Sequence, residues 1–177
     1  MAVTDAAPTT TDRTTSRLDH PSQQTHELQP FFTLTTTLLR AVRQHDFDTL
    51  AMLCDDDAGI VDVDPGGQSV MIRTRQEWEG WFHGLFGALD ELGAETDSLV
   101  LDYRAFVDEA LGWSVLEFRQ FLELGDLVAT FDCVATIIWK RTEDGWREAR
   151  WHCSVLSQDV PDELMALAAG DPDALAA

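Results

Sequence analysis

The chain of 177 residues is 45% hydrophobic and 25% charged, a balance that excludes collagen-like, wholly disordered and disulfide-scaffold proteins. Its 32 acidic and 12 basic residues give a formal net charge of -20, which excludes binding to nucleic acids or anionic membrane surfaces through a basic patch. This length predicts a single domain with one buried core, and no apolar run approaches the ~20 residues of a membrane span.

The charged residues are biased in type, because 21 of the acidic residues are Asp and 11 of the basic residues are Arg. This Asp-rich, Lys-poor composition resembles that of proteins from salt-accumulating halophiles, and an acidic protein from a high-Arg, low-Lys background explains it equally well. The three cysteines, Cys54, Cys133 and Cys153, match neither a CxxC metal pair nor a disulfide framework. We therefore expect reduced, buried thiols.

Both ends of the chain are predicted to lie outside the domain. Residues 1–27 are rich in Thr, Ser, Ala, Pro and Gln and lack the continuous apolar segment of a signal peptide. We interpret them as the disordered tail of a cytoplasmic protein. The domain then spans residues 28–157, and residues 158–177 form an acidic, Ala-rich C-terminal tail with one helical stretch from Asp162 to Ala169.

Helical patterns dominate the first half of the domain. Apolar residues recur at helical spacing behind Pro30 and predict a first helix of about four turns. Asp48 is suited to cap a shorter second helix that ends in the acidic run 55–57. Thr74 and Glu77 stand three residues apart as a capping box, and they open a third helix with an aromatic stripe on one face.

Strand patterns account for the rest of the domain. Residues 60–64 and 68–72 flank a Pro-Gly-Gly turn and predict a short hairpin ahead of the third helix. After Gly93 the pattern becomes that of β-strands separated by turn signals. The expected strands cover residues 98–107, 111–122, 127–140 and 146–156. The simplest topology for them is an antiparallel meander.

Alternation along these strands sorts their side chains into two faces, provided that the hairpin turns keep the parity of the sheet. One face is mostly apolar and is expected to receive the helices, with a few polar groups set into it: Tyr103, Gln120, Glu148, Arg150, His152 and Ser154. The other face mixes charges with Trp113, Val134 and Trp151, and this mixture predicts a homodimer formed through the sheet. The alternative is a solvated face whose tryptophans are covered by the tails.

Three segments resemble motifs of the nuclear transport factor 2-like (NTF2-like) superfamily, particularly of its SnoaL-like branch. Residues 45–48 (His-Asp-Phe-Asp) resemble the break after the family's first helix, and residues 63–67 (Val-Asp-Pro-Gly-Gly) resemble its Asp-Pro turn. Residues 144–154 are similar to the family's closing Gly-Trp-x-x-x-x-x-His-x-Ser strand. The resemblance covers residues 30–157 and implies an α+β fold, a curved antiparallel meander sheet wrapped around N-terminal helices as a cone with an internal pocket.

The resemblance leaves two kinds of function open, because the superfamily includes ketosteroid isomerase, scytalone dehydratase and polyketide cyclases as well as kinase association domains. The first is a cofactor-independent isomerase, dehydratase or cyclase that binds a small molecule between the third helix and the last two strands. The second is a non-catalytic association module whose pocket is vestigial or regulatory.

The resemblance to the isomerases implies a general base, since those members carry an Asp near the Asp-Pro turn that either Asp62 or Asp64 matches. Alternating acids on an edge strand are also an ordinary solvent-facing pattern. The proton-donating Tyr on the first helix of such isomerases has no counterpart, because Tyr103 is the only tyrosine. The association branch has a His where this chain has Arg150, while His152 agrees with that branch.

The apolar face supplies the remaining candidates. An imidazole can gain or lose a proton near neutrality, so His152 suits either a proton shuttle beside Glu148 or a structural imidazole. A buried Arg150 needs either an anionic ligand or Glu148 as its partner. Trp81 fits either a stacking platform or the core. The expected ligand-binding residues are therefore Arg150, Tyr103, Gln120, Glu148 and Trp81, with His152, Asp62 and Asp64 as catalytic candidates. No two-His spacing and no Gly-rich phosphate loop is present, so we expect neither a metal nor a cofactor.

Overall fold

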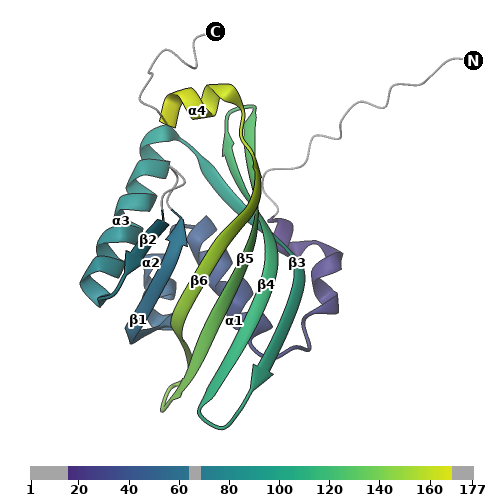
Figure 1. The fold of residues 1–177 in the computed structure, drawn as a ribbon, viewed down its shortest axis with the longest axis vertical. Coiled ribbons are helices and arrows are strands. Elements are labelled where there is room, and N and C mark those ends of the chain that lie inside the picture. Colours follow the sequence, from purple (N-terminus) through teal and green to yellow (C-terminus); the bar gives the residue numbers. More distant parts are fainter. Residues whose placement is uncertain (1–15, 64–68, 169–177) are drawn as a thin grey trace, which may run out of the picture.

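A curved sheet with helices on one face forms the body of the protein in the computed structural model, which describes residues 16–63 and 69–168 (Figure 1). Its helices are α1 (Phe32–Arg43), α2 (Phe47–Leu53), α3 (Arg75–Leu92) and α4 (Asp162–Ala168), and 3-10 turns lie at Arg17–Asp19 and Pro21–Thr25. Its strands are β1 (Cys54–Val63), β2 (Ser69–Ile72), β3 (Glu95–Val107), β4 (Leu111–Leu124), β5 (Leu127–Thr142) and β6 (Gly145–Asp159). Among these helices, none is long and apolar enough to cross a membrane.

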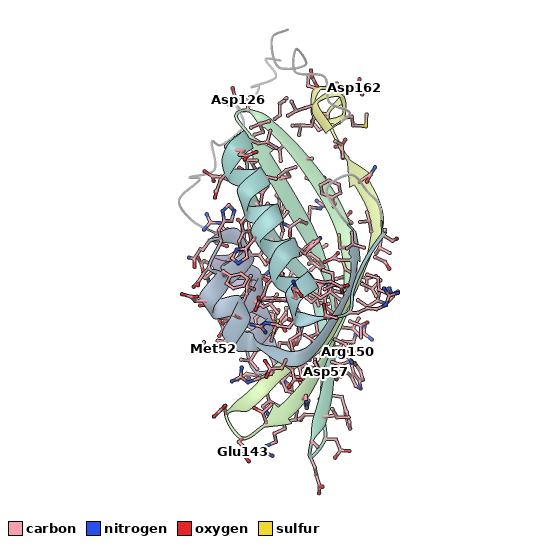
Figure 2. The ribbon with its side chains drawn as sticks, turned by 90° about the vertical axis from the view of Figure 1, so that its left-hand side faces the viewer. Met52, Asp57, Asp126, Glu143, Arg150 and Asp162 are labelled. Carbon is pink, nitrogen blue, oxygen red and sulfur yellow. The ribbon has the colours of Figure 1, made fainter. Side chains whose placement is uncertain are left out.

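Within the described residues the sheet has the order β2-β1-β6-β5-β4-β3. The expected meander is confirmed, because β3, β4, β5 and β6 pair antiparallel in sequence order. The β1–β2 hairpin joins them through parallel pairing of β1 with β6, so the sheet as a whole is mixed. We call the face covered by α1 and α3 the inner face and the opposite one the outer face (Figure 2). This arrangement confirms the α+β fold class.

Local sequence signals explain the helix boundaries. The capping box at α3 is confirmed, since Thr74 accepts a hydrogen bond from the Glu77 N–H and the Glu77 carboxylate accepts one from the Thr74 N–H. The cap of α2 is Asp46 rather than Asp48, because the Asp46 carboxylate accepts hydrogen bonds from both the N–H and the hydroxyl of Thr49. The acidic run 55–57 belongs to β1 and not to the end of α2.

The chain enters α1 through a strained aromatic residue. Phe31 has a left-handed backbone with φ of 62°, a conformation that bulky side chains rarely adopt. Its ring stacks on Trp139 with the centroids 5.4 Å apart and meets Trp146 edge-on at 5.0 Å. The ring also lies against Gly112 of β4, where a side chain would collide with it. Aromatic packing therefore holds the strained backbone in place.

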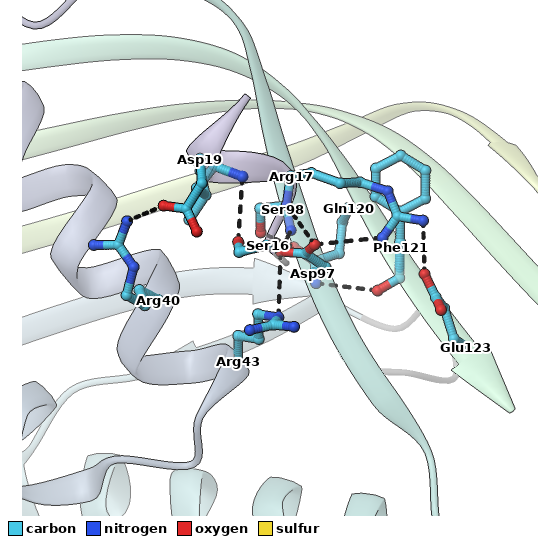
Figure 3. A network of polar contacts seen from close by, with 11 residues as sticks. Ser16, Arg17, Asp19, Arg40, Arg43, Asp97, Ser98, Gln120, Phe121 and Glu123 are labelled. Atoms are coloured by element: carbon cyan, nitrogen blue, oxygen red, sulfur yellow. Dashed lines mark hydrogen bonds and ion pairs between the residues drawn. The ribbon is translucent and has the colours of Figure 1, made fainter. Parts of the chain in front are cut away.

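The packed chain begins earlier than the expected tail boundary at residue 27. Residues 1–15 lie outside the described residues, but residues 16–30, which we call the strap, run along the edge of β3. Leu18 is buried in the hydrophobic core, and Asp97 of β3 accepts hydrogen bonds from the Ser16 hydroxyl and the Arg17 N–H, each 2.8 Å long (Figure 3). The strap is thus part of the fold.

The division of side chains between the two faces differs from the expected one because the ladders contain β-bulges. Register shifts leave an extra residue at Leu101 in β3, and at Ala149 and Leu156 in β6. Each extra residue reverses the alternation that follows it. Trp151 therefore faces the inner side, whereas Arg150 and His152 face the outer side.

Candidate functional site

A buried carboxyl lies at the centre of the inner face. Glu148 of β6 is 3% exposed and is paired with Trp139 on one side and with Cys54 on the other. The Cys54 thiol donates a hydrogen bond to Glu148 Oε2 at 3.3 Å. Burial raises the pKa of Glu148 from 4.5 to about 7, the hydrogen bond from Cys54 opposes this rise, and the charge of Asp62 adds to it. Glu148 can therefore both donate and accept a proton near neutrality.

Asp62 of β1 faces the same side of the sheet. The parallel register sets Ile60 opposite Trp151 and Val61 opposite His152, so alternation places Asp62 on the inner face with Ile60. Its negative charge raises the pKa of Glu148, and hydrogen bonding with it contributes to the raised pKa of the Cys153 thiol. Asp62 is only partly buried. We call Glu148 and Asp62 the inner acid pair.

The three cysteines surround this pair as free, buried thiols, as expected. Burial is the main cause of the raised pKa of Cys54, and the neighbouring Glu148 carboxyl raises it further. The pKa of Cys153 is raised chiefly by its hydrogen bond with Cys133, and the same contact lowers the pKa of Cys133. Cys54 and Cys153 are thus held as neutral thiols, which suits hydrogen bonding and not nucleophilic attack.

The first turn of α3 brings a cation close to Cys54. The Arg75 guanidinium lies 4.5 Å from the centre of the Trp78 ring, and its Nε bonds to Glu79 at 3.1 Å. Both Arg75 and Trp78 act on Cys54, since each lowers the pKa of that thiol. Neither Arg75 nor Cys54 was a candidate from the sequence. The capping box next to Arg75 was the available signal, because it fixes this residue in the turn that faces β1.

The structure places Arg150 and His152 away from the inner acid pair. Arg150 lies on the outer face against Gly59, with its Nη2 3.4 Å from the Asp57 carboxylate and a second bond to the Asp57 carbonyl (Figure 2). His152 is exposed on the same face. The expectation that these two residues point into one cavity with Glu148 is wrong, because the bulge at Ala149 turns them outward.

The other predicted ligand-binding residues face inward but serve packing. The Tyr103 hydroxyl donates to the Pro30 carbonyl at 3.0 Å, and burial raises the pKa of this group. Gln120 accepts a 2.7 Å hydrogen bond from the Ser98 hydroxyl. Trp81 of α3 packs edge-on against Phe82. Asp64, the second candidate base, lies outside the described residues.

Two further features bear on binding. Over residues 16–63 and 69–168, no group of three or more His, Cys, Asp or Glu side chains is placed to hold a metal ion.

An open groove of about 300 Å³ lies where the strap meets α1. Its lining comes from the end of the strap, the start of α1 and the strands below: Gln29, Pro30, Phe31, Thr33, Leu34, Val107 and Trp146. This groove is not the expected location between α3 and the last two strands.

Comparisons with known proteins agree on one family. A family model described as a SnoaL-like domain matches residues 33–158. An NTF2-like family protein from Streptomyces avermitilis is similar in structure, with a TM-score of 0.62 and 17% identity over 78% of this chain and 99% of that one. No curated protein matches the chain in sequence.

Other similar structures include an enzyme and an association domain. A hexachlorocyclohexane dehydrochlorinase (LinA, type 2) has a TM-score of 0.59 and 16% identity, covering 72% of this chain and 84% of that one. The association domain of C. elegans CaMKII has a TM-score of 0.55 and 16% identity, covering 75% and 95%. These likenesses establish the NTF2-like fold, and function has to be argued from the site.

Proposed function

Because the chain belongs to the SnoaL-like domain family, we propose that it binds a small molecule against the inner face of its sheet and moves a proton on that molecule through the inner acid pair. The reaction class is a cofactor-independent isomerisation, dehydration or cyclisation. The observation that carries the proposal is the buried Glu148 carboxyl, whose pKa of about 7 lies near the working pH, on the same face as the charged Asp62. Acids shifted in this way concentrate at functional sites.

The two carboxyls differ in environment and so suit different roles. Asp62 is partly exposed and charged, and it acts as the base that removes a proton from carbon. Glu148 in its neutral form donates a hydrogen bond or a proton to the substrate oxygen that gains charge. In this role Glu148 replaces the first-helix tyrosine of the isomerases, which this chain lacks. Cys54 positions Glu148 through its hydrogen bond, and Arg75 acts on the Cys54 thiol, without either contacting the substrate.

The comparison with LinA supports this class of reaction. Its name describes a dehydrochlorinase, and loss of hydrogen chloride removes a proton from carbon. A single carboxylate base beside a polar group is sufficient for such a step. Only this class of proton removal is proposed for the present chain, and not the LinA substrate.

Proton exchange with D2O tests the proposal without knowledge of the substrate. A panel of small enones and cyclic ketones is incubated with the protein in D2O, and deuterium uptake next to the carbonyl is followed by NMR. We expect Asp62→Asn to lower the exchange rate by about 10²–10⁴-fold, the usual contribution of a general base, and Glu148→Gln to lower it by less. Arg150→Met and His152→Asn are matched controls on the outer face. They are expected to exchange at the rate of the unaltered protein.

The opposite pattern would contradict the proposal. If His152→Asn stops exchange while Asp62→Asn retains it, the chemistry does not depend on the inner acid pair. If the unaltered protein speeds deuterium uptake by none of the compounds relative to buffer, the second candidate function, a non-catalytic association module, is favoured.

The outer face supports that second candidate, a homodimer formed through the sheet. Phe106 and Trp113 are 56% and 41% exposed and stack with their ring centroids 6.2 Å apart. This stack begins the first of four cross-strand rows on the outer face: Phe106–Trp113–Ile138–Arg150, Arg104–Val115–Thr136–His152, Asp102–Glu117–Val134–Ser154 and Leu99–Arg119–Asp132–Ser157. The rows contain three basic and three acidic residues, whereas the whole chain has 12 basic and 32 acidic residues. Because the charges in these rows balance, a second copy with the same charge of -20 meets little repulsion at this face.

A charge placed at the centre of this face tests the dimer. We expect the protein to be a dimer and Val134→Asp to make it a monomer, because an unpaired carboxylate would be buried in the interface. Leu92→Asp introduces the same charge at the exposed end of α3 and should leave the dimer intact. Light scattering over a range of concentrations measures both. A monomeric unaltered protein at every concentration would show the interface argument to be wrong.

A further inference from the structure

The strap occupies the free edge of the sheet. β3 is the edge strand, and its other side pairs with β4. The side-chain amides of Gln23 and Gln29 donate hydrogen bonds to the main-chain carbonyls of Val100 and Tyr103, each 2.9 Å long. Val100 and Tyr103 are three residues apart, so in a regular strand their carbonyls would point to opposite sides. The extra residue at Leu101 makes both carbonyls point away from β4. Without the strap they would form an open edge for strand pairing.

The strap holds this position through side chains and not through a strand ladder. Its latch is Arg17, whose Nη2 lies 2.7 Å from the Glu123 carboxylate and whose guanidinium stacks 3.8 Å above the Phe121 ring (Figure 3). The same side chain reaches Asp97 at 3.4 Å. The Asp97 and Glu123 side chains are only 7% and 15% exposed, and Leu18 adds an apolar anchor in the core, so these contacts together hold the strap closed. Removing the latch and the Leu18 anchor together is expected to release the strap, while the antiparallel ladders of β3 to β6 keep the sheet folded.

The covered edge is self-complementary. Asp102 and Arg104 flank Tyr103, with 46% and 79% of their side chains exposed. A two-fold axis through Tyr103 would pair two β3 strands antiparallel and set Asp102 of each copy opposite Arg104 of the other. The same register sets the exposed Leu101 opposite Ala105. Opposite charges and apolar pairs directly across a ladder stabilise it, whereas like charges destabilise it.

From these observations we infer that the edge of β3 is an interaction surface for a second copy of this chain, and that the strap masks it. Once the strap is released, Tyr103 of each copy exchanges two main-chain hydrogen bonds with its counterpart, and the two sheets become one. This interface uses the edge of β3 rather than the sheet surface, although Asp102 and Arg104 also lie in the outer-face rows, and it does not depend on the inner acid pair. It adds a second, controllable mode of assembly to the protein.

The experiment opens the strap in the Val134→Asp chain, so that pairing through the outer face does not contribute. Arg17→Ala, Leu18→Ala, Gln23→Ala and Gln29→Ala together remove the latch, the buried anchor and the edge hydrogen bonds. We expect faster amide hydrogen exchange in residues 16–30 and a doubling of the mass in light scattering. Unchanged protection in β5 shows that the core stays folded. An open strap with a monomeric mass at all concentrations overturns the inference, and so does a strap whose exchange is unaltered.

Charge swaps then test the register in the opened chain. Asp102→Arg sets like charges opposite each other and is expected to return the mass to that of a monomer. Asp102→Arg combined with Arg104→Asp reverses both partners and is expected to restore the dimer. If the double swap stays monomeric, the two-fold axis through Tyr103 is wrong. Growth beyond a dimer also contradicts it, because a two-fold interface closes.

Discussion

Replacing Gly112 by alanine is expected to destabilise the fold by about 2–3 kcal/mol. The new Cβ would collide with the Phe31 ring and would come within 2.9 Å of the Phe106 carbonyl oxygen. Neither group can move aside without a large loss of stability. The Phe31 ring is confined between Trp139 and Trp146, and the carbonyl belongs to the β3 backbone. Urea denaturation followed by tryptophan fluorescence measures the loss.

A glycine on α3 provides the matched control. Gly84 has no heavy atom within 4 Å of the position that a Cβ would take. Gly84→Ala is therefore expected to stabilise the protein by about 0.5–1 kcal/mol, because alanine favours the helix. Equal effects at the two positions would show that Gly112 does not serve the Phe31 packing.

Stability is expected to fall as the pH rises from about 4.5 to about 7, because the inner acid pair contains a carboxyl that the fold keeps neutral. The folded pKa of Glu148 lies above the unfolded value, so the folded chain binds more protons in this window. Its contribution is fully present below pH 4.5 and is lost as the pH passes 7. The shift corresponds to about 3 kcal/mol.

Glu148→Gln removes this titration while keeping the shape of the side chain. We expect the variant to be less pH-dependent than the unaltered protein and more stable at about pH 8. Chemical denaturation at a series of pH values measures the difference. Glu117→Gln on the outer face is the control, since Glu117 is exposed and its removal should leave the slope unchanged. If Glu148→Gln keeps the full pH dependence of the unfolding free energy, that dependence comes from other groups.

The sequence predicted the elements that local signals determine. Apolar spacing behind Pro30 and the capping box at Thr74 are complete within one helix each, and α1 and α3 follow them. Turn signals separated the strands of the meander, and the order of the motifs identified the family. The register of a strand depends instead on partners far away in the chain.

At the candidate site, the register of β6 depends on a bulge at Ala149 that the sequence analysis did not predict. Trp146 and Trp151 are five residues apart, so an unbroken strand cannot turn both of them inward. Burying a tryptophan is favourable, whereas burying an unpaired guanidinium is costly. A bulge at Ala149 resolves this conflict, since it buries Trp151 and leaves Arg150 beside Asp57. The odd spacing of the tryptophans was the available signal for the bulge.

The inward orientation of Glu148 was predicted from the alternation of β6, because this residue precedes the bulge, but its neutral carboxyl could not be predicted from the sequence alone. Its neighbour Cys54 comes from β1, nearly one hundred positions earlier, and that strand was expected to begin only at residue 60. With Cys54 in a helix end, nothing on the sequence argued for a neutral carboxyl. The parallel pairing of β1 with β6 creates that environment.

The protonation of Glu148 tests this account most directly. Carbon-13 labelling of the glutamate carboxyls, with Glu148→Gln to assign the signal, allows the titration of this group to be followed by NMR. We expect a midpoint near pH 7 for Glu148, well above the 4.5 of an ordinary glutamate. A midpoint near 4.5 would show that the carboxyl is solvated and charged, and would contradict the proposed role of the inner acid pair.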